Sequence, residues 1–335
     1  MAINTTSTRM LNRNSVLGLL AFTIGFGLWA QNYKLVPPVN VSHADFPESE
    51  AQSEHMQVLQ VAAVPPVLYR KDVTYVSRDG LDLTLQILAP RGVEKPLPCI
   101  VYVQGSAWFE QNVYSNLPSL AAFAKRGYVI AMVQYRPSTV APFPAQLQDA
   151  KTAIRYMRQN AEIYHVDPNN IFIWGDSSGG HTALMVGLTQ NHPELDTAEY
   201  PDQSIKVNAV VDFYGPTDIS QMNYEPSIMD HIGPKTPEGM LIGGKNVHEN
   251  LELAARTNPI NYIAKGGDAA PIFILHGSKD RLVPFKQSVL LANALKANGY
   301  AHEFYQLKGA DHGSNEFWTE EIFDRVHEFL RSNTQ

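Results

Sequence analysis

Residues 170–188 join a buried strand to a helix through a turn of small residues, and this junction constrains the fold more than any other stretch. The apolar run at 171–174 follows a turn signal at 167–170 and predicts a buried strand, and residues 182–188 are typical of a helix. Between them, Gly175-Asp176-Ser177-Ser178-Gly179 fits G-x-S-x-G, a strained turn that points its central serine away from the sheet. Only glycine fits two positions on either side, and the following helix directs backbone N–H groups toward developing negative charge. The junction predicts an α/β chain with Ser177 as the candidate nucleophile.

Two other interpretations of this stretch deserve comparison. It resembles the G-D-S-G-G segment of trypsin-like proteases, but Ser178 intervenes, a buried strand precedes it and a helix follows it. The single cysteine, Cys99, also allows no disulfide within the chain. A Gly-rich turn without chemistry stays open as the second alternative, because small residues cluster by chance in such loops.

Composition limits the partners and cofactors. The chain has 335 residues, a net charge of −7 and 44% hydrophobic residues, enough for one large domain or two small ones. The acidic balance and the lack of a basic patch argue against a nucleic-acid partner. We expect no metal and no organic cofactor, because the sequence has no Cys/His metal spacing and no G-x-x-x-x-G-K. Nothing in the sequence determines the oligomeric state.

The first 66 residues differ from the rest. Arg9 and Arg13 precede an uncharged apolar run at 16–30, so residues 1–30 resemble a signal peptide or membrane anchor. We therefore expect export to the periplasm, the medium or an outward-facing membrane position, and leave cleavage and membrane contact through 16–30 open. Residues 31–66 are rich in proline and lack periodicity, which predicts a linker before a domain at 67–335.

From residue 67 onward, an antiparallel hairpin leads into alternating strands and helices. The hairpin is predicted for 73–76 and 81–88 around Asp79-Gly80. Further strands are predicted at 99–103, 128–135, 171–175, 207–213, 272–275 and 303–307, and helices at 117–125, 144–157, 182–188, 284–298 and 322–330. This pattern predicts an α/β fold with a mostly parallel central sheet, helices on both faces and a ligand site at the carboxyl ends of the strands.

Three loops at those ends carry polar residues. Gln104-Gly105-Ser106-Ala107-Trp108 follows the strand at 99–103, Asp280 follows the strand at 272–275, and His312 follows the last strand. The order serine, acid, histidine is the order of the α/β-hydrolase topology. Asp311 is a weaker candidate acid because it is adjacent in sequence to the base, and Asp212, inside a strand, is a weak alternative. His181 is expected to pack in the interior or to line the pocket, and His276 to cap a strand end, rather than to act as the base.

These motifs resemble the esterase/lipase type of the α/β-hydrolase superfamily over about residues 67–335. The segments Gln134-Tyr135-Arg136, 141–146 and 174–181 are most similar to the subgroup of bifunctional feruloyl and acetylxylan esterases. The resemblance implies a catalytic set of Ser177, Asp280 and His312, and an oxyanion hole from Ser178 N–H and an N–H of Ser106 or Ala107. It also implies a substrate pocket that includes Gln104, Gly105, Trp108, Asp176 and His181. The H-G-G-G-W of the family reads Q-G-S-A-W here, so side chains stand where glycines let the backbone approach the substrate.

The expected function is a serine carboxylic ester hydrolase that acts through an acyl-enzyme on short-acyl esters, either small molecules or groups linked to polysaccharides. A peptidase or amidase on the same fold is one alternative, although residues 1–66 are too few for the β-propeller that would favour it. A catalytically weak hydrolase fold used for binding is the other. Residues 216–262, apolar and rich in Pro and Gly, are expected to form a small cap over the site or an ordinary surface excursion.

Overall fold

The computed structural model describes residues 35–61, 66–264 and 269–335. Contacts divide the chain into two units, residues 1–61 and 62–335. The described part of the first unit is exposed and irregular, apart from the short 3-10 helix η1, His43–Asp45. The predicted signal or anchor at 1–30 lies outside the described residues. Among the residues that are described, no helix is long and apolar enough to cross a membrane.

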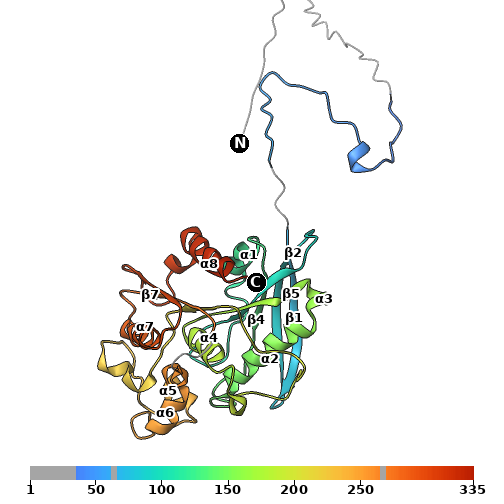
Figure 1. Cartoon of the computed structure of the whole chain (residues 1–335). Helices are drawn as coiled ribbons and strands as arrows, with labels where there is room; N and C mark the ends of the chain where they lie inside the picture. The colour runs from blue at the N-terminus through green and yellow to red at the C-terminus, as the bar shows by residue number, and fades with distance from the viewer. Residues whose placement is uncertain (1–34, 62–65, 265–268) are drawn as a thin grey trace, which may run out of the picture. The chain divides into compact units, whose positions relative to one another are not determined.

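The second unit is built on one eight-stranded sheet (Figure 1). Its strands stand in the order β1-β2-β4-β3-β5-β6-β7-β8; β1 and β2 pair antiparallel, β2 pairs antiparallel with β4, and the other pairs are parallel. The strands are β1 Val67–Arg78, β2 Leu81–Pro90, β3 Leu97–Val103, β4 Val129–Val133, β5 Val166–Asp176, β6 Val210–Phe213, β7 Ile272–Gly277 and β8 His302–Leu307. The predicted mostly parallel sheet is confirmed.

Helices cover both faces of this sheet. They are α1 Leu117–Ala124, α2 Ala145–Gln159, α3 Ala161–Tyr164, α4 Ser178–Leu188, α5 Pro237–Leu241, α6 Leu251–Thr257, α7 Lys286–Asn298 and α8 Glu320–Ser332. The short 3-10 helices of this unit are η2 Pro193–Leu195, η3 Ile219–Tyr224, η4 Pro259–Tyr262 and η5 Asn315–Trp318. Successive residues of a strand face opposite sides, so Val101 packs in one cluster with α2, α4 and α7, whereas Tyr102 packs in another with α1 and α8.

The hairpin at the start of the sheet follows from its turn. Arg78 pairs with Leu81, so only Asp79 and Gly80 connect the two strands. Both have positive φ, 51° and 76°, as a two-residue turn matched to strand twist requires. The predicted hairpin and its Asp-Gly turn are confirmed.

The predicted turn at 167–170 is wrong as a strand boundary. These residues lie inside β5, which begins at Val166. Asn169 N–H donates to Asp167 Oδ1 at 3.0 Å, and the pairing with β3 jumps from Leu97–Val166 to Cys99–Ile171. Local turn chemistry therefore produces an irregularity in the strand, because pairing with β3 resumes immediately after it.

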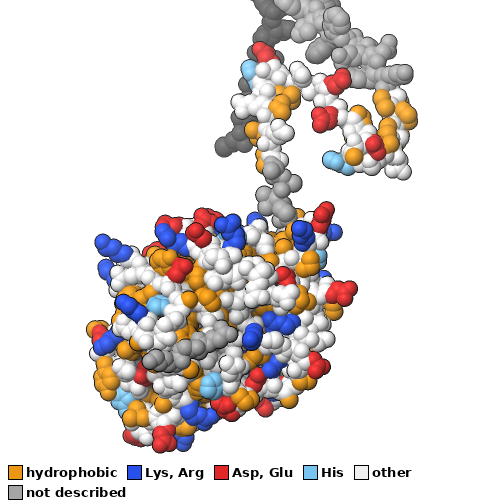
Figure 2. Space-filling view, in the orientation of Figure 1, with side chains coloured by type: hydrophobic (Ala, Val, Ile, Leu, Met, Phe, Trp, Pro, Cys, Tyr) orange, Lys and Arg blue, Asp and Glu red, His pale blue; other side chains and the backbone are white. Residues whose placement is uncertain are grey.

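Residues 216–262 contain η3, α5, α6 and η4, and share an apolar cluster with the loop after β3. The cluster consists of Trp108, Ile219, Leu241, Ile242, Val247 and Ala254. Because Trp108 belongs to the loop at 104–108, this cluster fixes that loop and the 216–262 segment to each other. The face drawn in Figure 2 carries acidic and basic side chains intermixed, without a broad basic patch on that face.

Candidate active site

Ser177 lies alone in the turn between β5 and α4. Its backbone has φ 53° and ψ −126°, a strained conformation for a residue with a side chain. Its N–H donates to Phe213 O at 2.8 Å, which ties the turn to β6. A Cβ on Gly175 would lie 2.1 Å from Gly179 O, and one on Gly179 would lie 1.9 Å from Val103 O. Both glycines of the motif are therefore sterically required.

The structure brings Ser177, His312 and Asp280 together at the carboxyl edge of the sheet. His312 Nε2 lies 2.8 Å from Ser177 Oγ, and His312 Nδ1 lies 2.7 Å from Asp280 Oδ2. Since an ionised carboxylate only accepts, Nδ1 donates to Asp280 and Nε2 is left to accept the Ser177 proton. The ring of Tyr214 packs edge-on against His312, with centroids 4.7 Å apart.

Asp280 is held ionised by its surroundings. Its side chain is fully buried, which alone would raise its pKa, but hydrogen bonds from His276 and His312 outweigh burial and hold the pKa well below its ordinary value. Leu282 N–H and Val283 N–H also donate to its Oδ1, at 2.9 and 2.8 Å. Asp280 can therefore orient a neutral imidazole and stabilise an imidazolium.

His276 belongs to this support and is not a second base. Its Nε2 lies 3.2 Å from Asp280 Oδ2 and 3.0 Å from Val283 O, and its Nδ1 lies 2.7 Å from Ser288 Oγ. The side chain is fully buried in the interior, behind Asp280. The sequence predicted that His276 caps a strand end, but not its burial or its contact with Asp280.

The loop after β3 is tied down by Ser178. Ser106 N–H donates to Ser178 Oγ at 2.9 Å, and Ser106 Oγ lies 2.7 Å from Phe109 O and 2.8 Å from Tyr135 OH. Ala107 has a positive φ of 56°, as does Trp108. Among the described residues, the N–H groups of Ala107 and Ser178 have no hydrogen-bond acceptor, so they are free to bind an oxyanion.

Of the two donors that the sequence left open in this loop, the structure therefore favours Ala107. The Ser106 amide is engaged by Ser178 and would have to give up that bond to meet a substrate. The Ser106 amide is engaged because the fold brings its N–H against the hydroxyl of Ser178. Sequence reasoning missed Tyr135, whose hydroxyl is buried in this network, because an aromatic residue at a strand end is typical of the core.

Four of the five predicted pocket residues lie behind Ser177 rather than beside it. They are Gln104, Gly105, Asp176 and, described below, His181. Gly105 N–H donates to Asp176 Oδ1 at 3.0 Å, and the hydroxyl of Tyr102 also donates to that oxygen, at 2.5 Å. Gln104 is 8% exposed and donates to Ser115 Oγ. Burial raises the pKa of Asp176, and hydrogen bonds from Tyr102 and Gly105 oppose this effect. These residues hold the loop against the core.

His181 is also packed. Its Nε2 lies 2.7 Å from Thr257 O, and its Nδ1 accepts a hydrogen bond from Trp108 Nε1 at 3.3 Å. Complete burial lowers the pKa of His181 to about 4, so the ring is neutral at physiological pH. Only Trp108 among the five predicted pocket residues contacts the cavity described next.

A small cavity of about 70 Å³ lies directly over Ser177. The elbow, the loop after β3 and the loops after β7 and β8 form one side of it, through Ala107, Trp108, Ser177, Ser178, Leu282, Val283 and His312. The other side comes from the 216–262 segment, through Pro216, Met229, His231, Pro237 and Glu238. No motif in the sequence marks His231 or Glu238 as functional, since an isolated His carries no signal and a Glu after Thr-Pro is typical of a helix start.

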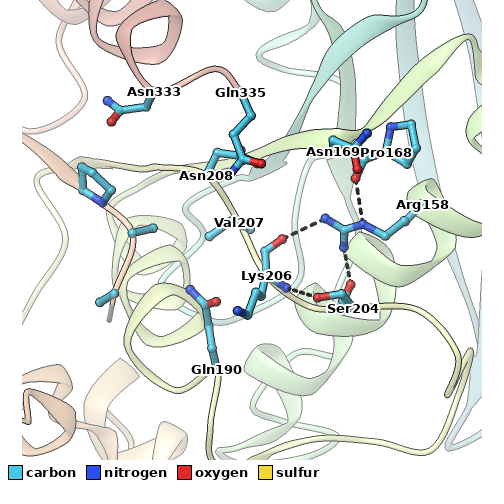
Figure 3. Close-up of a pocket in the computed structure, with 13 residues that line it drawn as sticks. Arg158, Pro168, Asn169, Gln190, Ser204, Lys206, Val207, Asn208, Asn333 and Gln335 are labelled. Atoms are coloured by element: carbon cyan, nitrogen blue, oxygen red, sulfur yellow. Dashed lines mark hydrogen bonds between the residues drawn. The ribbon is translucent and has the colours of Figure 1, made fainter. Parts of the chain in front are cut away.

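A larger cavity, of about 480 Å³, lies at the opposite end of the strands (Figure 3). Pro168, Val207 and Pro271 lie near the starts of β5, β6 and β7 there, and Arg158 donates to the carbonyls of Pro168 and Lys206. The described residues that line it include no His, Cys, Asp or Glu side chain. In the part of the chain that the structure describes, no three metal-ligating side chains gather.

Comparison with known proteins agrees with this geometry. The sequence model of the BD-FAE family matches residues 85–295, more than half of the chain. A truncated carbohydrate esterase from gut microbiota is 31% identical with a TM-score of 0.73, over 82% of this chain and 98% of that one. The esterase Est2 of Thermogutta terrifontis with bound propionate is 26% identical with a TM-score of 0.64, over 81% and 96%.

Curated sequences give the same result over a shorter part of their length. Esterase LipC of Mycobacterium tuberculosis is 29% identical over 65% of this chain and 53% of its own. Esterase LipQ of the same organism is 30% identical over 64% of this chain and 50% of its own, so the chain spans about half the length of these relatives. The matched family, the sheet order and the elbow agree: the chain belongs to the BD-FAE family and has the α/β-hydrolase fold.

Proposed function

We propose that this protein hydrolyses carboxylic esters through an acyl-enzyme on Ser177. The observation that carries the proposal is the continuous contact from Asp280 through His312 to Ser177, at 2.7 and 2.8 Å. Relatives that are named esterases support the reaction class. The carbohydrate esterase among the similar structures supports an ester attached to a sugar as one substrate.

In the proposed reaction, His312 Nε2 takes the hydroxyl proton of Ser177 while Oγ attacks the ester carbonyl. Asp280 stabilises the imidazolium, and the N–H groups of Ala107 and Ser178 receive the oxyanion. His312 then protonates the departing alcohol. Water, activated by the same ring, releases the acid and restores Ser177.

We propose short acyl groups because the cavity over Ser177 is small. Its volume of about 70 Å³ compares with roughly 300–1,000 Å³ for sites that enclose drug-sized ligands. Trp108 closes one side and is fixed by the cluster shared with residues 216–262, so enlargement requires that cluster to move. The relative crystallised with propionate is consistent with a short acyl group.

Two measurements test this function. A fluorophosphonate probe should label the wild type and fail on Ser177→Ala and on His312→Ala, which removes the base. Labelling of Ser177→Ala at the wild-type rate would place the nucleophile elsewhere, with Ser178 the nearest candidate.

A panel of aryl esters from acetyl to palmitoyl, with a feruloyl ester, acetylated xylan and a peptide anilide, tests the substrate class. The highest kcat/KM is expected at two to four carbons, roughly. A maximum at about eight carbons or beyond would contradict the short-acyl proposal, because each buried methylene contributes about 0.8 kcal/mol in an open apolar pocket. Anilide cleavage as fast as acetate cleavage would favour a peptidase, and complete inactivity with no labelling would favour a binding protein.

A further inference from the structure

Glu238 is a buried carboxylate in the wall of the cavity that contains Ser177. It is 3% exposed and is the second residue of α5, whose start is capped by Thr236. One oxygen, Oε1, lies 2.8 Å from His231 Nδ1. The other, Oε2, has no hydrogen-bond partner among the described residues. A carboxylate oxygen in this state is unfavourable unless a donor reaches it.

His231 fixes the position of this carboxylate relative to the catalytic residues. Its Nε2 lies 3.1 Å from Leu282 O and 2.9 Å from Ser227 Oγ. Leu282 in turn donates its N–H to Asp280. Glu238 is therefore linked through His231 to the loop that carries Asp280.

The rest of the cavity offers Glu238 no substitute partner. Apart from His231, its other lining side chains from residues 216–262 and from the loop after β7 are apolar: Pro216, Met229, Pro237, Leu282 and Val283. The polar groups opposite, Ser177, Ser178 and His312, are used by the reaction. A substrate group that donates a hydrogen bond can partner Glu238 Oε2, whereas an alkyl group leaves this oxygen without a partner.

We propose that Glu238 accepts a hydrogen bond from a hydroxyl group next to the ester, so that hydroxyl-bearing esters are preferred over alkyl esters of the same size. The inference rests on the proposed ester hydrolysis and names its specificity residue. A neutral hydroxyl fits better than an ammonium group, because the apolar walls would remove water from a full positive charge. The hydroxyl comes either from the alcohol, as in a partly acylated sugar or polyol, or from the acyl group.

Pairs of esters in which a hydroxyl replaces a methyl group separate these two sources. On the alcohol side, 2-hydroxyethyl acetate is compared with propyl acetate; on the acyl side, ethyl glycolate is compared with ethyl propionate. For each pair, the kcat/KM ratio is divided by the ratio for hydroxide-catalysed hydrolysis, which removes intrinsic reactivity. In the wild type, this corrected preference should be about tenfold or more for at least one pair. A value near unity for both pairs would overturn the inference without any variant.

Variants assign the preference to Glu238. Glu238→Gln keeps the size of the side chain, Glu238→Ala removes it, and Glu249→Gln neutralises an exposed carboxylate of the same segment as a control. The corrected preference should fall about tenfold in Glu238→Ala, fall less in Glu238→Gln, because an amide can still hydrogen-bond a hydroxyl, and stay unchanged in Glu249→Gln. An equal loss on the hydroxyl and methyl esters would show a structural role only and contradict the inference.

The proposed function is tested separately in the same samples. Wild-type protein that is labelled at Ser177 and hydrolyses aryl acetate, but shows no hydroxyl preference, would refute only the role of Glu238. Wild-type protein that is not labelled would refute the proposed function itself. The acyl-side pair alone responding would place the hydroxyl on the acid, and the alcohol-side pair alone would place it on a polyol.

Discussion

Two regions enclose the small cavity, and they are built in different ways. The catalytic floor, defined as Ser177, Asp280, His312 and the loop at 104–108, sits on the ends of paired parallel strands. The cap wall, defined as residues 216–262, has short elements, such as α5 with five residues and α6 with seven. Sheet register places the floor, whereas individual side-chain contacts such as His231 with Glu238 place the wall.

The difference teaches where each part of the function is encoded. A parallel sheet brings the ends of separate strands to one edge regardless of surface detail, so the reacting groups follow from topology. The wall has no such rule, and its contacts with Trp108 and Leu282 exist only once the chain is folded. We propose that the floor sets the reaction class and the wall sets the choice of substrate, and the following changes test that division.

The largest effect is expected when Asp280 of the floor loses its charge. Asp280→Asn should lower kcat by about a thousandfold or more, because an amide presents an N–H to His312 and favours the wrong tautomer. Asp311→Asn is the control, since Asp311 binds Arg281 at the surface and not the imidazole. Steady-state kinetics on aryl acetate measures both. A greater loss for Asp311→Asn would assign the acid to that residue.

A second test concerns Asp212, which lies fully buried on β6 beneath the start of α4. Burial raises its pKa to about 7, and Gly215 N–H donates to its Oδ1. Because the folded protein keeps the proton that the unfolded chain releases, stability falls as pH rises from about 4 to about 7 and then levels off. Asp212→Asn should lack this fall.

Chemical denaturation at several pH values measures this difference. The stability of Asp212→Asn relative to the wild type should increase by on the order of a few kcal/mol between about pH 4 and pH 8. A pH-independent difference would contradict the assignment. The catalytic acid should behave in the opposite sense: the pKa of Asp280 is lowered, so its stabilising contribution is present above about pH 4 and is lost as pH falls through the folded pKa.

A smaller effect is expected at the edge of the floor. Ser178→Ala removes the acceptor for Ser106 N–H, so the loop that presents Ala107 N–H is less well fixed. We expect about a tenfold lower kcat with little change in KM, because the oxyanion forms after substrate binds. Tyr135→Phe, which removes the hydroxyl that contacts Ser106, should cost less. An effect confined to KM would show that Ser178 positions substrate instead.

The smallest effect is expected in the cap wall. Thr236 Oγ1 accepts a hydrogen bond from Gly239 N–H and caps α5. Thr236→Ala should lower the free energy of unfolding by about 1 kcal/mol, and Thr236→Ser should restore most of it. Turnover of a simple aryl acetate should stay within about twofold, since the floor is untouched. A large loss of aryl acetate turnover would show that the two regions are not separable.

The sequence predicted the strands beneath the floor, and the structure brings Ser177, Asp280 and His312 together at their ends, because the signals for these elements are local. The hairpin turn at Asp79-Gly80 and the glycines around Ser177 each act within a few residues. The order of strands and loops then indicated which loops follow the carboxyl ends of the strands. The turn signal at 167–170 also acted locally, since the pairing of β5 with β3 skips these residues, but pairing at Val166 starts the strand before them.

The supporting contacts of the site could not be predicted. Tyr102 and Tyr135 look like ordinary core aromatics, and their hydroxyl groups gain roles only from partners 74 and 43 residues away, Asp176 and Ser178. Predicting His181, Gln104 and Asp176 as pocket residues assumed that residues near the motif face the substrate. Packing turns them inward, because the loop at 104–108 needs buried anchors.

The bond between Ser106 N–H and Ser178 Oγ limits how this loop can be exchanged. The two residues are 72 positions apart in the chain, yet the hydrogen bond between them holds the loop in place. A loop grafted from a relative with the glycine-rich sequence would keep this backbone N–H but lose the Ser106 hydroxyl that contacts Phe109 O and Tyr135 OH, and a graft of this loop elsewhere would lose its anchor on Ser178. The loop therefore cannot be transplanted alone, and a protein that receives it also needs a serine at the position of Ser178.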